Sequence, residues 1–139
     1  MALREALLVI ENKGQLAAFI SKWLRSRGRH CVWVKAVDVI SLLLESSDEI
    51  SAILLIDDDP VEDSLVNNLK MLRQWSRTVP IVVTTVQNNS GLEKEIRELG
   101  IFYFHTKIDG MADLKTAVVC ALDLAVKENL FLTPPPESR

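Results

Sequence analysis

Three consecutive aspartates in the middle of the chain are residues that could do chemistry. The stretch AILLIDDDP, residues 52–60, passes from five apolar residues directly into Asp57, Asp58 and Asp59, and then Pro60. Adjacent carboxylates repel one another, so their presence at the end of an apolar run needs an explanation. We expect water, a helix N-terminus, a cation or a lysine from elsewhere in the chain to offset the repulsion.

Polar side chains that complement these acids follow three other apolar runs. Glu11 and Asn12 follow the first run, Thr85 ends the fourth, and Lys107 follows the fifth. If these runs are parallel strands of one sheet, their carboxyl ends share a rim and the polar side chains meet there. Carboxylate oxygens are the ligands that Mg²⁺ prefers, and a lysine can neutralise a carboxylate. The pattern therefore predicts that a divalent cation, Lys107, or both share this rim with the aspartates.

The elements that must position these residues alternate regularly along the chain. Continuous apolar runs predict strands at 6–10, 30–36, 52–56, 79–85 and 101–105, and helical periodicity predicts helices at 15–28, 38–46, 62–76, 88–100 and 110–130. Strands without polar alternation are buried on both faces, which is typical of a parallel sheet covered by helices. We expect a doubly wound, flavodoxin-like (βα)5 fold in three α/β/α layers, with strand order 2-1-3-4-5.

Composition limits the class of protein. The chain has 139 residues, 48% hydrophobic and 25% charged, with a net charge of −3. These values fit one globular domain and argue against a general nucleic-acid surface. No apolar run reaches the length of a membrane span, so we expect a cytoplasmic protein. Cys31 and Cys120 lie in apolar segments, which predicts two buried thiols rather than a disulfide. We expect a domain over 1–128 and a proline-rich tail or linker over 129–139.

Taken together, these positions resemble the receiver domain of two-component response regulators over about residues 4–128. The segment LLID places Asp57 at the phosphoaccepting aspartate of that family, and VIEN places Glu11 and Asn12 at its acidic pair. The segments PIVVTT and GIFYFHTK place Thr85 and Lys107 at the family's hydroxyl and lysine positions.

The resemblance implies a switch rather than an enzyme, with self-phosphorylation and autodephosphorylation as its only reactions. A histidine kinase or phosphotransfer protein would supply a phosphoryl group to Asp57, and Thr85 and Lys107 would contact it. Phe104 would move as Thr85 turns inward, and the fourth helix, fifth strand and fifth helix would bind an effector or output domain. A homodimer is compatible with this function. The implied Mg²⁺ ligands are Glu11, Asn12, Asp57 and Asp59.

Three departures from the family pattern leave an alternative function open. Asn12 replaces an acid, and its neutral amide is a weaker ligand for Mg²⁺. Ile108 follows the lysine where the family usually has proline, and only two residues separate Asp57 from Pro60 instead of three. The alternative is a pseudo-receiver that docks other proteins independently of phosphorylation. Asp58 could replace Asp57 as acceptor only if the strand shifted its register by one residue.

Simpler roles also remain open for these residues. The aspartates could cap the helix at 62–76, and Asn12 could be a helix N-cap. Phe104 is more often a core residue than a switch, His105 has no assigned role, and Trp33 lies on an expected edge strand. An aspartyl phosphohydrolase is disfavoured because the chain leaves no room for a cap domain. No glycine-rich dinucleotide fingerprint or phosphate-binding P-loop occurs.

Overall fold

The structure is a computed structural model that describes residues 6–46, 50–58, 63–86, 90–106 and 109–132. The strands are β1 (Ala6–Ile10), β2 (His30–Val34), β3 (Ile50–Ile56), β4 (Ile81–Thr85) and β5 (Tyr103–Thr106). The helices are α1 (Gln15–Ser26), α2 (Val39–Ser46), α3 (Ser64–Trp75), α4 (Ser90–Glu98) and α5 (Met111–Leu132), and a 3-10 turn, η1 (Ala36–Asp38), precedes α2.

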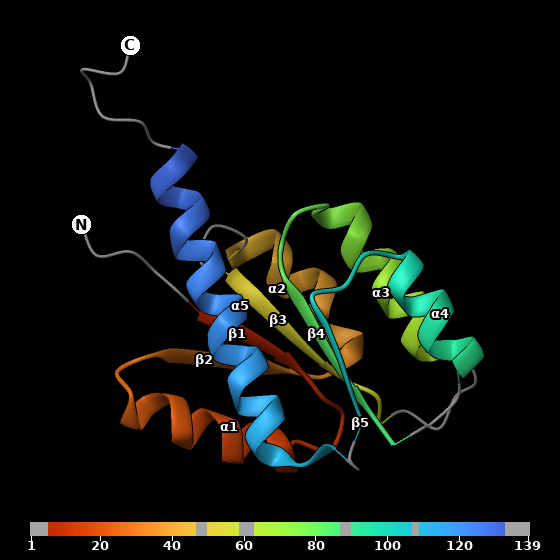
Figure 1. Cartoon of the computed structure of the whole chain (residues 1–139), viewed down its shortest axis with the longest axis horizontal. Coiled ribbons are helices and arrows are strands. Elements are labelled where there is room, and N and C mark those ends of the chain that lie inside the picture. Colours follow the sequence, from red (N-terminus) through yellow and green to blue (C-terminus); the bar gives the residue numbers. More distant parts are fainter. Residues whose placement is uncertain (1–5, 47–49, 59–62, 87–89, 107–108, 133–139) are drawn as a thin grey trace.

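The five strands form one parallel sheet in the order β2-β1-β3-β4-β5, which confirms the predicted fold and strand order (Figure 1). Ile10 pairs with Leu55, and Ile56 pairs with Thr84. This register brings the carboxyl ends of β1, β3 and β4 to the same edge of the sheet. Within the described ranges, no helix has the combination of length and apolar character that crossing a membrane requires.

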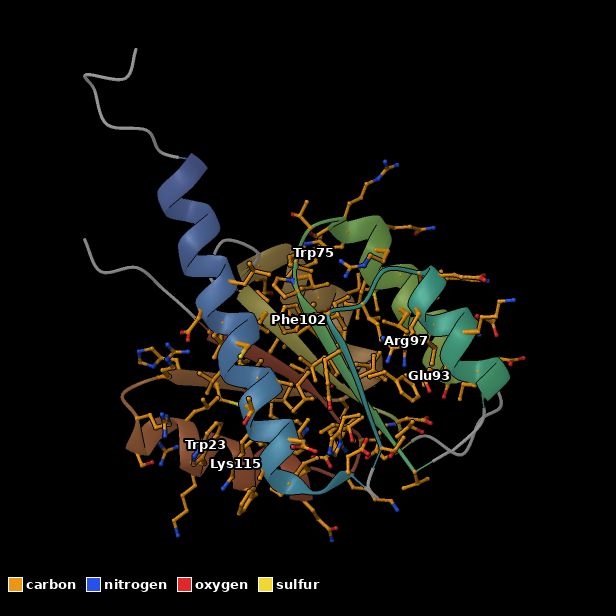
Figure 2. All side chains as sticks on the ribbon, in the orientation of Figure 1. Trp23, Trp75, Glu93, Arg97, Phe102 and Lys115 are labelled. Carbon is orange, nitrogen blue, oxygen red and sulfur yellow. The ribbon has the colours of Figure 1, made fainter. Side chains whose placement is uncertain are left out.

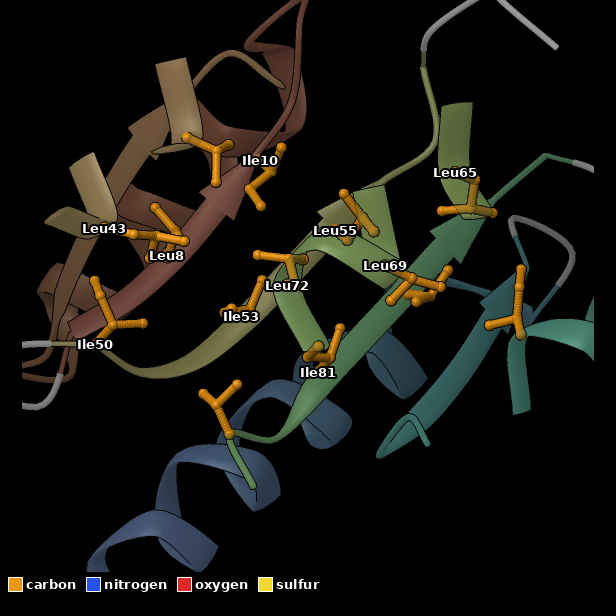
Figure 3. Packing of buried hydrophobic residues seen from close by; sticks show 14 of the residues in the cluster. Leu8, Ile10, Leu43, Ile50, Ile53, Leu55, Leu65, Leu69, Leu72 and Ile81 are labelled. Carbon is orange, nitrogen blue, oxygen red and sulfur yellow. The ribbon is translucent and has the colours of Figure 1, made fainter. Parts of the chain in front are cut away.

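Both faces of the sheet are covered, which explains why the strands are apolar without alternation. On one face Leu8, Ile10, Ile53 and Leu55 pack against residues of α2, α3 and α4 (Figure 3). On the other face, residues of α1 and α5 pack against the strand side chains that point the opposite way. The buried residues of this second cluster include Leu7, Val9, Ala17, Ile20, Leu24, Leu54, Val82, Leu114, Val118 and Leu122.

Some element boundaries differ from the prediction. The strand predicted at 101–105 begins later, at Tyr103, where pairing with Val82 of β4 starts. The helix α5 continues past residue 128 to Leu132, and the predicted domain boundary stays a prediction. Phe19 of α1 is 46% exposed. The Lys115 ammonium of α5 lies 5.0 Å from its ring centroid and also faces Trp23 (Figure 2).

The two cysteines differ in environment, so the prediction of two buried thiols is wrong for Cys120, which is exposed on α5. Cys31 is half-buried on β2, and burial raises the pKa of its thiol to about 11.

The thiolate is the reactive form of cysteine, so we expect Cys31 to be alkylated about a hundredfold more slowly than an unperturbed thiol at mildly alkaline pH. Iodoacetamide labelling followed by peptide mass spectrometry measures this, and equal rates at Cys31 and Cys120 would contradict it.

Candidate functional site at the carboxyl ends of β1, β3 and β4

Asp57 lies directly after β3 and is bound by Thr85 at the end of β4. The Asp57 backbone N–H donates to the Thr84 carbonyl at 2.9 Å, which continues the ladder of the sheet by one residue. The buried Thr85 hydroxyl donates to Asp57 Oδ2 at 2.7 Å. The ladder shows no slip at Ile56, so Asp57 and not Asp58 occupies the first position after the strand.

Glu11, predicted as a magnesium ligand, caps the start of α1. Its side chain is buried, and its two carboxylate oxygens accept from the backbone N–H groups of Ala17 at 2.7 Å and Leu16 at 3.2 Å. Gly14 is the N-cap of α1 and has no side chain to satisfy these N–H groups. Glu11 therefore supplies the missing acceptor, and its negative charge is stabilised by the positive end of the helix dipole.

Asp58 binds the loop between β1 and α1. Its Oδ1 accepts from the backbone N–H of Asn12 at 3.0 Å, and its Oδ2 accepts from that of Lys13 at 2.8 Å. The helix α3 begins at Ser64 with Asp63 as N-cap, so the capping role considered for the aspartates is wrong for Asp58. Backbone donors thus offset the charge of Asp58, and a hydroxyl donates to Asp57.

Asn12 ties the same loop to η1. Its Oδ1 accepts from the backbone N–H of Ala36 at 3.1 Å. Because Gly14 is the N-cap of α1, the N-cap role considered for Asn12 is wrong. The amide oxygen that would face a cation is instead used to hold η1 against the loop after β1.

These contacts do not fit the expected magnesium site. Glu11, Asn12 and Asp58 direct their side-chain oxygens at backbone N–H groups of this chain. Together with Asp57 they line a pocket that is partly open to solvent. Among the described residues, no three His, Cys, Asp or Glu side chains converge in a way that could hold a metal ion. Asp59, the fourth expected ligand, lies outside the described ranges.

Trp33 fixes the loop that carries Glu11. Its indole Nε1 donates to the Glu11 carbonyl oxygen at 2.6 Å, and its ring covers Gly14. A Cβ on Gly14 would lie 2.7 Å from Trp33 Cζ2, and Gly14 has a positive φ of 86°. The contact between Trp33 and Gly14 was not predicted. The single glycine after Glu11 and Asn12 is the sequence feature that indicates a close approach there.

His105, to which the sequence assigned no role, links β4 to the loop before α5. The Gly110 carbonyl can only accept, so His105 Nε2 donates to it at 2.7 Å. His105 Nδ1 lies within hydrogen-bond distance of the Thr84 hydroxyl, 2.8 Å from Oγ1. Hydrogen bonds from the Thr106 backbone N–H and hydroxyl lower the pKa of the Asp109 carboxyl. Lys107 lies outside the described residues, and its approach to the Asp57 carboxylate stays a prediction.

Phe104 is a core residue, as its position in β5 suggested. Its side chain is buried among residues of the sheet face that α3 and α4 cover. The Arg97 guanidinium of α4 lies 6.0 Å from its ring centroid. Arg97 Nε donates to Glu93 Oε2 at 2.8 Å, which forms an ion pair along α4 (Figure 2). Whether Phe104 moves with Thr85 stays a prediction.

Comparison with known proteins gives matches only among solved structures. No protein-family model matches the sequence, and no curated protein matches it. The signal receiver domain of a protein described as a Luxo repressor from Vibrio parahaemolyticus is similar, with a TM-score of 0.80, 22% identity and coverage of 95% of this chain and 100% of that chain.

Two further structures agree with this match. A response regulator receiver domain protein from Clostridium thermocellum has a TM-score of 0.74 and 13% identity, covering 92% of this chain and 98% of that one. A response regulator receiver protein from Pseudomonas putida has a TM-score of 0.72 and 19% identity, covering 85% and 98%. The resemblance to receiver domains is therefore confirmed as a likeness of fold.

Proposed function

We propose that this chain, whose fold is that of receiver domains, is a cytoplasmic signalling module that acts by binding other proteins without Mg²⁺-dependent phosphorylation. One observation carries the proposal. Glu11, Asn12 and Asp58, which surround Asp57, are each bound to backbone N–H groups of the chain. A phosphoryl donor that approaches Asp57 needs a cation to neutralise its negative charge. The side chains that would hold this cation are used instead to hold two loops and a helix in place.

The face formed by α4, β5 and α5 is the surface that we propose for binding an effector or output domain. On α4 it carries the Glu93–Arg97 ion pair, and the 38% exposed Phe102 directly precedes β5. Paired charges and an exposed aromatic suit a protein partner because they offer polar contacts that set orientation and an apolar contact. The module then works as a switch or scaffold and not as an enzyme.

A second candidate function is favoured by the contact between Thr85 and Asp57. In this alternative Asp57 accepts a phosphoryl group from a histidine kinase or phosphotransfer protein, and Lys107 and Thr85 contact the phosphoryl oxygens. The Thr85 hydroxyl donates to Asp57 Oδ2 at 2.7 Å, so it lies within reach of a phosphoryl group on that carboxylate. As the family resemblance implies, Phe104 would then move as Thr85 turns inward.

Incubation with acetyl phosphate and Mg²⁺ separates the two candidates. Intact-mass spectrometry of the wild type, Asp57→Asn and Asp58→Asn gives the number of phosphoryl groups bound. We expect none on any of the three proteins. A phosphorylated wild type together with an unmodified Asp57→Asn variant would overturn the proposal and establish the second candidate, because Asp58→Asn keeps the acceptor and serves as the matched control.

A further inference from the structure

The helix α2 and the turn before it carry an apolar stripe on their solvent side. Val37, Ile40 and Leu44 are 86%, 59% and 82% exposed. The opposite side of the same segment is already used, because Val39 and Leu43 are buried against the sheet. The segment is therefore apolar on two sides, and packing within this domain explains only one of them.

The spacing of the stripe is that of a helix–helix contact. The three residues follow one another at intervals of three and four positions, which matches the narrow seam along which one helix packs on another. An exposed apolar patch rimmed by polar residues is typical of an interaction site. A second helix with the same spacing would cover it.

The charges at the two ends of the stripe favour the same segment of a second copy of this chain as the helix that covers it. Exposed Lys35 precedes the stripe, and exposed Glu45 follows it. In an antiparallel pair of identical helices, Lys35 faces Glu45 of the second copy and Val37 faces Leu44 of the second copy. A parallel pair would instead place like charges side by side, which is unfavourable.

We infer that a second copy of this chain covers the stripe through an antiparallel α2–α2 contact with two-fold symmetry. This inference goes beyond the proposed function and does not depend on it, because neither Asp57 nor the face of α4, β5 and α5 takes part. The contact involves one short helix from each copy, so it belongs with the small and weak interfaces. We expect dimers to form in the micromolar to millimolar range.

Sedimentation equilibrium of the whole chain tests the inference. The wild type is expected to approach twice the monomer mass as its concentration rises, and Ile40→Glu is expected to weaken dimerisation by about tenfold or more, since it places a carboxylate in the seam. Val86→Glu is the matched control, because Val86 is a 62% exposed aliphatic residue outside α2, and it should dimerise like the wild type. Circular dichroism verifies that both variants are folded.

Charge exchange tests the antiparallel direction. Lys35→Glu is expected to weaken the dimer because it places two carboxylates opposite each other, and the double variant K35E/E45K is expected to restore it. A wild type that stays monomeric at millimolar concentration would overturn the inference, and so would a dimer that Ile40→Glu leaves intact. A double variant no tighter than Lys35→Glu would overturn the antiparallel arrangement.

Discussion

Replacing Glu11 with alanine is expected to lower the free energy of unfolding by about 3 kcal/mol. The substitution removes two charge-assisted hydrogen bonds at the start of α1 and leaves the buried Ala17 N–H without its acceptor. It also removes a negative charge from the positive end of the helix dipole. Urea unfolding followed by far-ultraviolet circular dichroism measures the change.

The isosteric variant Glu11→Gln distinguishes a cap from a metal ligand. We expect it to cost roughly 1–2 kcal/mol, because a glutamine oxygen can accept one of the two bonds and its NH₂ group cannot accept the other. A carboxylate kept for a metal would be repelled by Asp57 and Asp58 in the absence of the ion, and its neutralisation would stabilise the protein. An increase in stability would therefore contradict the capping role. Glu95→Gln, on the exposed side of α4, is the control and should change stability by less than about 0.5 kcal/mol.

Replacing Gly14 with alanine is expected to destabilise the protein by about 2–4 kcal/mol. The positive φ of 86° accounts for roughly 1–2 kcal/mol with any L side chain. The remainder comes from the new Cβ, which would lie 2.7 Å from Trp33 Cζ2 and force the indole away from the Glu11 carbonyl. Thermal and urea unfolding give the size of the effect.

Two companion variants isolate the clash. Gly28→Ala is the matched control, because Gly28 also has a positive φ, 73°, but a Cβ there would meet nothing within 4 Å. We expect it to cost only the backbone term, roughly 1–2 kcal/mol. Adding Trp33→Ala to Gly14→Ala should give a smaller loss than the sum of the single losses, since the clash is then absent. Strict additivity would show that the two residues do not interact.

The fold could be predicted because each strand announces itself locally. Residues 6–10 and 81–83 are apolar without interruption, and a short run of this kind with β-branched members is typical of a strand buried on both faces. The parallel order then follows from the alternation with helices. Phe19 shows the limit of helical periodicity as a guide to burial. Its spacing from Leu16 and Trp23 is that of one helix face, yet its ring is partly exposed and faces the ammonium group of Lys115 on α5.

The positions of Glu11, Asp57 and Thr85 could be predicted, but the hydrogen-bond partners of the loop acids could not. Glu11, Asp57 and Thr85 meet at one edge of the sheet because parallel strands end there. Asp58, however, binds backbone N–H groups that lie more than forty positions away in the chain, and no local pattern encodes that contact. The cover of Trp33 over Gly14 is equally a product of strand pairing, which sets β2 beside β1.

The most direct test of the account follows backbone amides during a magnesium titration by ¹H–¹⁵N NMR. The amides of Lys13, Ala17 and Ala36 report on Asp58, Glu11 and Asn12, whose side-chain oxygens they bind. We expect their resonances to stay in place up to millimolar Mg²⁺, because those oxygens remain bound to backbone donors. Saturable shifts of these three amides at the same Mg²⁺ concentration would show that the acids leave their partners for the cation, and would contradict it.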